Sequence, residues 1–322
     1  MSSLSKQLET LRSLNRRLFD ADAPVSLEQT LSRALRVLSR QPTLSKYQST
    51  LFSESHLGVD RGHMQTSEES AKFDQELRKF LQDASSLWMR DGMMDVYAWL
   101  CDKWRVHRML VDELLMSVMW MHETFVFARI CVKVPVEEHE RWRFLEGYKR
   151  KWSKVVKSGE EGEGFGREML VDRMKSDRDV GLRLFEYGCC VGGRVFVFGV
   201  CLLVEWMQGL KVFNDENVVL VLKAVNAAMK SGDEGVRVGG MMLVCQLSSN
   251  VKLSEQVVEA LMVEIVKGNG KTIDEELYAL CVLFETQDLK NIPVEVLNKM
   301  SLVDGIEMKM KEFVDRYEIQ KF

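Results

Sequence analysis

The sequence predicts an all-α fold, namely an α-solenoid that stacks antiparallel helix pairs. Apolar residues recur at helical spacing along most of the 322 residues, and only 4 prolines interrupt them. One helix pattern also repeats, because Val218-Val219-x-x-Leu222 returns 39 residues later as Val257-Val258-x-x-Leu261. A period of roughly 40 residues is typical of helical repeats, and such pairs stack because one pair cannot cover its own apolar face.

Residues 1–57 are expected to form cap helices at the start of the array. The first helix has one apolar stripe, which consists of Leu4, Leu8, Leu11, Leu14 and Leu18. Pro24 ends that helix, Ser26 is placed to cap the next one, and Pro42 ends the second. The leucine stripe either packs down as the cap of the array or receives a helix or tail from a partner protein. Both interpretations stay open.

The helical pattern strengthens after Ser67. It predicts a helix that Gly92 ends, three short helices over 94–104, 109–120 and 125–134, and a longer helix over 137–157 after Pro135. The acidic, glycine-rich stretch 158–166 is expected to be a solvated loop.

The second half is rich in valine, and 191–204 resembles a strand locally. We predict helix there, because the neighbours are helical and no hairpin turn follows. Glycines inside these helices are expected to permit close helix crossings or to mark helix ends. The predicted pairs are 214–230 with 233–249, and 254–267 with 272–288. Asp233-x-x-Val236-Arg237 resembles the start of the second helix of a HEAT repeat, so the solenoid is predicted to be HEAT-like.

Composition limits the classes of partner. The net charge is -4, so no overall positive field draws the chain to nucleic acid or to anionic lipid. The longest apolar run, 195–204, is too short to cross a bilayer, so no membrane partner is expected. Seven cysteines without paired spacing are expected to be reduced thiols, as in a cytosolic or nuclear protein.

No motif in the sequence points to catalysis. The spacing of Cys101, His107, His122 and Cys131 fits no zinc pattern. The glycines from Gly162 to Gly166 follow no predicted strand and stand among glutamates, which repel phosphate. We therefore predict a protein that is not an enzyme and that has no catalytic residue, cofactor, metal or small-molecule substrate.

A local basic stripe does stand out. On a helical wheel its members share one face, opposite an aromatic face that is expected to be core; they are Arg143, Arg150, Lys154 and Lys157. Such a face can bind a phosphate backbone or an acidic partner, because those contacts need charge but no base-reading groups. The alternative, which we favour, is a solvated basic face whose charge the neighbouring acidic loop offsets.

Several short motifs occur in order within the first 135 residues. They are Met1-Ser2-Ser3-Leu4-Ser5-x-Gln7-Leu8, Thr50-Leu51-Phe52-Ser53-Glu54-Ser55 with Asp60-Arg61, Ala84-Ser85-Ser86-x-Trp88, Trp99-Leu100 with Arg105-Val106-His107, Leu114-Leu115-x-Ser117, and Thr124-x-Val126-Phe127-x-Arg129-Ile130. In this order they resemble the N-terminal region of the large HEAT-repeat subunit of the UtpA (t-Utp) complex, part of the small-subunit processome. Phe125 stands where that family has proline, and beyond Pro135 only the helical pattern is similar.

The resemblance implies a non-enzymatic scaffold of the nucleus and nucleolus, active in ribosome biogenesis and pre-rRNA processing and linked to ribosomal RNA transcription. It implies partners among the other UtpA subunits, which include WD-repeat propeller proteins, and contact with the five-prime external transcribed spacer of pre-rRNA. Because family members are several times longer, the chain is expected to be an N-terminal fragment with one domain over 1–322. Two alternatives stay open: a direct RNA-binding module and a general HEAT-repeat adaptor.

Overall fold

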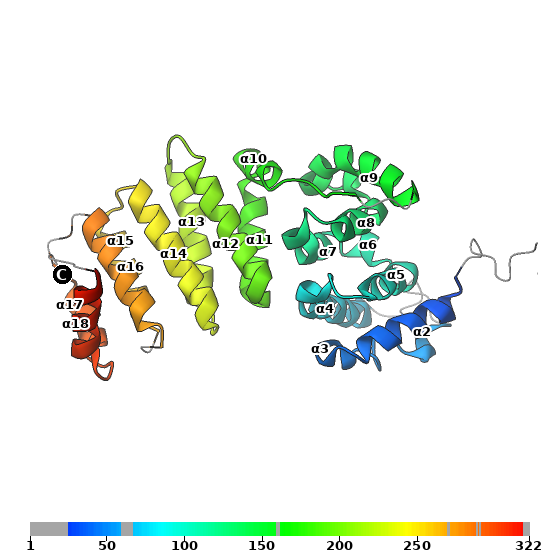
Figure 1. Ribbon diagram of the computed structural model, residues 1–322, viewed down its shortest axis with the longest axis horizontal. Coiled ribbons are helices and arrows are strands. Elements are labelled where there is room, and N and C mark those ends of the chain that lie inside the picture. Colours follow the sequence, from blue (N-terminus) through cyan, green and yellow to red (C-terminus); the bar gives the residue numbers. More distant parts are fainter. Residues whose placement is uncertain are drawn as a thin grey trace, which may run out of the picture. The chain divides into compact units, whose positions relative to one another are not determined.

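The computed structural model describes residues 25–58, 67–158, 162–268, 271–287, 289 and 291–317 (Figure 1). These residues form helices joined by turns and contain no strand, which confirms the all-α prediction. Contacts between Cα atoms divide the chain into two compact units, one of 1–65 with 91–104 and one of 66–90 with 105–322. Each unit is described by itself, and the single domain expected over 1–322 stays a prediction.

The first unit is built on α2 (Leu27–Leu38), which packs against α5 (Met93–Trp104). Ser26 caps α2 as predicted, because its hydroxyl accepts the N–H of Gln29 while the Gln29 side chain accepts the N–H of Ser26. Two shorter elements complete the described part of the unit, α3 (Pro42–Ser45) and the 3₁₀ helix η1 (Glu54–His56).

One carbonyl organises the centre of this unit. The indole Nε1 groups of Trp99 and Trp104 both donate to the carbonyl oxygen of Leu51, at 3.0 and 2.9 Å. Both tryptophans and Leu51 are fully buried. Because a buried indole N–H needs an acceptor, these bonds fix how the turn after α3 meets α5.

The second unit begins with the 18-residue helix α4 and a series of shorter helices. They are α4 (Ser67–Ala84), η3 (Ser85–Leu87), α6 (Val106–Met109), α7 (Val111–Val118), η4 (Met119–Met121), α8 (Phe125–Lys133), η5 (Val136–Glu138), η6 (Glu140–Leu145), α9 (Glu146–Ser158) and α10 (Glu168–Ser176). Tryptophans again bond across elements: Trp88 donates to Ser117 Oγ at 3.2 Å, and Trp120 donates to the carbonyl of Ser85 at 2.8 Å. Ser85, Trp88 and Ser117, which belong to the motifs that carry the resemblance, are therefore buried packing residues.

The single helix predicted over 137–157 is wrong. The chain instead forms two 3₁₀ helices, η5 and η6, before α9 begins at Glu146. His139 between them is extended, and a distant carboxylate holds the next turn: Asp112 in α7 accepts the indole N–H of Trp142 at 2.6 Å and pairs with Arg141. This tertiary hydrogen bonding outweighs the helical periodicity.

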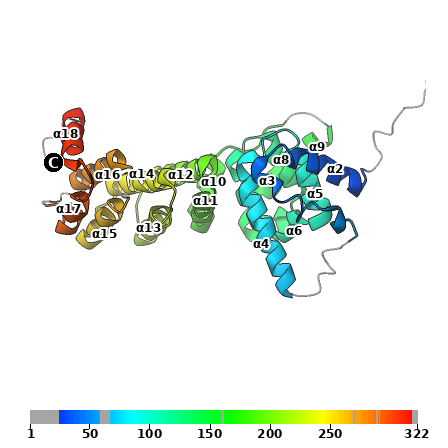
Figure 2. The same ribbon diagram turned by 90° about the horizontal axis from the view of Figure 1, so that it is seen from below.

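From Arg178 onward the helices form successive pairs. They are α11 (Arg178–Val191) with α12 (Gly193–Gln208), α13 (Asp215–Met229) with α14 (Glu234–Asn250), α15 (Glu255–Ile265) with α16 (Ile273–Thr286), and α17 (Val294–Met300) with α18 (Ile306–Tyr317). Contacts join α12, α14 and α16 in one layer, and Figure 2 shows α11, α13, α15 and α17 in the other. The predicted helix over 191–204 and both predicted pairs are confirmed, as expected for a HEAT-like solenoid.

Two glycines let α11 and α12 approach closely, as the sequence suggested. A Cβ at Gly188 would lie 2.8 Å from the Cα of Phe196, and a Cβ at Gly199 would lie 3.0 Å from the Cα of Phe185. Between the helices Gly192 has φ +74°, a conformation that other residues rarely adopt. These glycines therefore set the spacing of the pair.

Asp233 and Arg237 explain the repeat motif found in the sequence. Asp233 caps α14 by accepting the N–H of Val236 at 3.0 Å. The Arg237 guanidinium donates to the carbonyl of Met229 at 2.8 Å and to that of Ile265 at 3.2 Å, which satisfies carbonyls at the ends of α13 and α15. One side chain thus ties two neighbouring repeats together.

Candidate functional site

The structure exposes all four residues of the predicted basic stripe. Arg143 lies in η6, and Arg150, Lys154 and Lys157 lie on α9. Arg150 forms an ion pair with Glu146 one turn earlier, which partly neutralises it. Within the described residues, no ion pair is formed by Arg143, Lys154 or Lys157.

Other cations of this segment are already engaged. Lys149 donates to the Val134 carbonyl at 2.7 Å and pairs with Glu137 at 2.9 Å, and this bond lowers the pKa of Glu137. Lys149 is therefore structural, and it stays outside the stripe. Arg143, Lys154 and Lys157 therefore stay as exposed positive charges on η6 and α9.

The opposite face of α9 packs against an aromatic cluster, as the helical wheel predicted. The ring of Phe165 lies at its centre, with ring centroids between 5.1 and 6.3 Å away in His122, Phe127, Phe144, Tyr148 and Trp152. Trp152 and Phe165 are buried, so these rings are core and are not free to stack on bases.

The expectation of a solvated loop over 158–166 is wrong for its described end. The Gly164 N–H donates to the carbonyl of Glu123, and the Phe165 N–H donates to that of His122, both at 3.0 Å. A Cβ at Gly164 would lie 1.7 Å from the carbonyl oxygen of His122, so only glycine fits. Gly164 lets the loop lie against the chain beside His122 and places Phe165 in the core.

His122 is the titratable group of this cluster. Its Nδ1 lies 3.1 Å from the Met119 carbonyl, so Nδ1 carries the hydrogen, and Nε2 has no hydrogen-bond partner in the described structure. Burial lowers the pKa of His122 below its ordinary value of 6.5, and the charge of Glu123 opposes this shift. Burial therefore favours the neutral form of the ring, which packs against Phe165 and Phe198.

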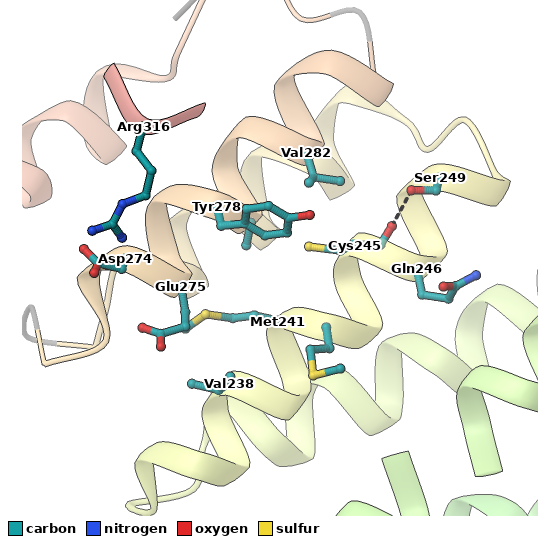
Figure 3. A pocket seen from close by; sticks show the side chains of 12 residues that line it. Val238, Met241, Cys245, Gln246, Ser249, Asp274, Glu275, Tyr278, Val282 and Arg316 are labelled. Atoms are coloured by element: carbon teal, nitrogen blue, oxygen red, sulfur yellow. Dashed lines mark hydrogen bonds between the residues drawn. The ribbon is translucent and has the colours of Figure 1, made fainter. Parts of the chain in front are cut away.

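The second surface is a groove of about 560 Å³ on the layer of α12, α14 and α16 (Figure 3). One wall is α14, with Val238, Met241, Met242 and Cys245 at helical spacing, and the other is α16, with Tyr278, Ala279 and Val282. Met242 is 55% exposed and Tyr278 is 51% exposed, so the groove is open to solvent. Its size is within the range of pockets that hold small ligands, roughly 300–1,000 Å³.

Polar groups stand at both ends of this groove. Gln246 and Ser249 lie at one end, and Asp274 and Glu275 from the first turn of α16 lie at the other, where Figure 3 shows Arg316 pointing toward Asp274. Burial raises the pKa of the Cys245 thiol to about 11, so this sulfur is not a reactive thiolate. The groove therefore offers apolar contacts and one excess negative charge.

Sequence reasoning did not predict the groove, although a signal was present. Apolar residues occur on both faces of α14, since Leu243 and Val244 face the core while Met242 faces solvent. The predicted leucine stripe, Leu4, Leu8, Leu11, Leu14 and Leu18, lies outside the described residues.

Within the described part of the chain, no three His, Cys, Asp or Glu side chains come together as a metal site would require. None of the described helices is both long enough and apolar enough to span a bilayer.

Comparison with known proteins shows what the chain is similar to. The family model of U3 small nucleolar RNA-associated protein 10 matches residues 218–322, which contain α14, α16 and the groove. HEAT repeat-containing protein 1 of Danio rerio is 24% identical over 84% of this chain, which spans 13% of that protein, and a Dictyostelium discoideum homolog is 22% identical over 89%, or 12% of its own length. U3 small nucleolar RNA-associated protein 10 of Saccharomyces cerevisiae is 34% identical over 33% of the chain and 6% of its own length. The chain therefore spans a small part of each relative, and it is similar to proteins named for HEAT repeats and for association with U3 small nucleolar RNA, names that denote no enzyme.

Proposed function

We propose that this chain is part of a non-enzymatic HEAT-repeat scaffold that assembles the nucleolar precursor of the small ribosomal subunit. The observation that carries this proposal is the similarity to U3 small nucleolar RNA-associated proteins. Stacked helix pairs support it, because such arrays present long surfaces to partners. The proposal includes membership of the UtpA complex, partners with WD repeats, contact with pre-rRNA and a link to ribosomal RNA transcription.

Immunoprecipitation of the tagged full chain tests the proposal. We expect U3 small nucleolar RNA and WD-repeat nucleolar proteins to co-purify, and the tagged chain to localise to nucleoli. A tagged HEAT-repeat protein of unrelated function is the control. Recovery of U3 RNA at the level of that control, together with exclusion from nucleoli, contradicts the proposal and favours a general HEAT-repeat adaptor.

A second candidate function is direct RNA binding by the basic stripe. The observation that favours it is that Arg143, Lys154 and Lys157 are exposed and form no ion pair with the other described residues. Phosphate contacts release counterions, so binding by such a surface depends on salt and not on base sequence. The acidic net charge restricts this interaction to the local stripe.

Charge reversal tests this second function. Replacing all four stripe residues with Glu should weaken binding to unrelated single-stranded RNAs alike and reduce the salt slope by about 0.7 for each phosphate that the stripe no longer neutralises. A matched control reverses four exposed cations elsewhere in the same unit, namely Lys79, Arg90, Lys211 and Lys223. If both variants lose affinity equally, or if neither does, the stripe is a solvated helix face and does not bind RNA.

A further inference from the structure

The outer face of α14 has a composition that is unusual for a surface helix. Its inner face buries Val236, Leu243 and Leu247, while the groove face carries Val238, Met242 and Cys245. A surface helix normally presents a polar face to water, whereas this face carries three apolar side chains before its polar end at Gln246 and Ser249. The described structure leaves the outer face of α14 open.

The facing wall on α16 repeats this arrangement. Ile273, Leu277 and Leu280 face the core, while Tyr278 and Val282 face the groove. Two adjacent helices with apolar ridges form a channel that accepts the ridge of a third helix. Since the backbone groups of α14 and α16 bond within their own helices, the groove has no edge for strand addition, and recognition must use side chains.

The charges at one end of the groove indicate which kind of occupant would complement it. Asp274 and Glu275 lie at one end of the groove, and neither forms an ion pair with another described residue. The single cation on the lining is Arg316, which points toward Asp274 in Figure 3. An occupant that places a cation beside Glu275 therefore complements the remaining charge.

We propose that the groove between α14 and α16 binds an amphipathic helix of a partner protein. Its apolar side chains lie against Met242, Tyr278 and Val282, and a lysine or arginine lies beside Glu275. Methionine suits this role, because its unbranched side chain adapts to the ridge that it receives. The inference rests on the proposed scaffold function and gives it a class of partner.

Three synthetic peptides test this proposal against the full chain by fluorescence anisotropy. The first is an amphipathic helix with a leucine stripe at 3.6-residue spacing and lysines flanking the stripe at both ends. The second replaces those lysines with glutamate, and the third keeps the lysines but has two prolines within the stripe. We expect the lysine peptide to bind, the glutamate peptide to bind at least about tenfold more weakly, and the proline peptide not to bind.

Substitutions in the chain test whether the peptide binds in the groove. Met242→Lys and Tyr278→Lys should each weaken the lysine peptide at least about tenfold, because each places charge in the apolar channel. Val219→Lys is the matched control, since Val219 is 48% exposed on α13 and outside the groove. Circular dichroism and thermal unfolding of each variant separate a binding loss from misfolding.

Reversing the charge of Glu275 gives the most specific test of the proposal. Glu275→Lys should weaken the lysine peptide and strengthen the glutamate peptide, which reverses their order of affinity. Glu285→Lys is its control, because Glu285 is exposed on the same helix and does not line the groove. This exchange requires the carboxylate of Glu275 to face the bound peptide.

Several outcomes overturn the inference. They are no binding of the lysine peptide at millimolar concentration, equal binding of all three peptides, or an affinity that Met242→Lys and Tyr278→Lys leave unchanged. A dimer of the chain that Met242→Lys dissociates also overturns it, since the occupant is then a second copy. U3 RNA recovery is a separate readout, so the scaffold function and the groove can fail independently.

Discussion

The pair α11–α12 and the segment from η4 to α10 are stabilised in different ways. The helix pair is stabilised by backbone proximity spread along its length, which Gly188 and Gly199 permit. The other segment depends on one residue, Phe165, whose ring is shared by α8, α9 and η6. Distributed packing tolerates local change, whereas a cluster around one ring is disrupted as a whole when that ring is removed.

Of the substitutions considered, removal of the Phe165 ring should reduce the stability of the chain most. Phe165→Ala removes a buried aromatic side chain and should lower the free energy of unfolding by about 3–5 kcal/mol, as measured by urea denaturation of the full chain. Glu163→Ala is the control in the same loop, because its side chain is exposed and its carbonyl still accepts the Trp152 indole. A destabilisation no greater than that of the control means that the cluster is not the anchor.

Adding one methyl group between α11 and α12 should destabilise the chain less than the loss of the Phe165 ring. Gly188→Ala places a Cβ 2.8 Å from the Cα of Phe196, and the resulting overpacking should cost about 1–3 kcal/mol, more than the gain in helix propensity of up to about 1 kcal/mol. Gly147→Ala in α9 meets no atom within 4 Å and should therefore be neutral or stabilising. Stabilisation by both substitutions in thermal unfolding contradicts the close crossing.

The smallest expected effect is a dependence of stability on pH, which arises from His122 in the Phe165 cluster. Because burial lowers the pKa of His122 in the folded chain, the unfolded chain binds more protons between that lowered pKa and 6.5. Stability should therefore fall as pH decreases below 6.5, and it should stop falling through this group once pH is below the folded pKa.

Urea midpoints between pH 4.5 and 7.5 measure this dependence. His122→Gln should flatten the profile relative to the unchanged chain, and His139→Gln, at a partly exposed turn, serves as the control. Parallel profiles for all three proteins rule out His122 as the source of the pH dependence.

Local sequence patterns predicted the helix pairs well, because the residues that begin, end and pack each pair lie close together in the sequence. Ser26 caps the helix for which it was expected, and Asp233 caps α14 where the repeat motif begins, since a cap bonds only three residues away. The helix expected over 137–157 failed because Asp112, from another helix, holds Trp142. No local pattern carries that information.

The two candidate sites also differ in how much of each can be predicted from local sequence. Exposure of the basic stripe was predictable, because opposite faces of a helix can be read from spacing, and so was the neighbouring Glu146 at i−4 from Arg150. The groove was not predicted, because apolar residues on two faces of α14 are compatible with packing on both faces. Only the spatial order of α14 and α16 shows that one of those faces stays open.

The first unit is discontinuous in sequence, and this has a consequence during synthesis. The carbonyl of Leu51 receives its two donors from Trp99 and Trp104, so the turn after α3 stays without its buried partners until about fifty more residues have been translated. The later helix pairs, by contrast, contact mainly their immediate neighbours in sequence, so we expect each pair to pack soon after it has been translated. A nascent chain that stops between 66 and 92 exposes the apolar face of α2, and we expect cellular chaperones to bind it there before any later repeat has formed.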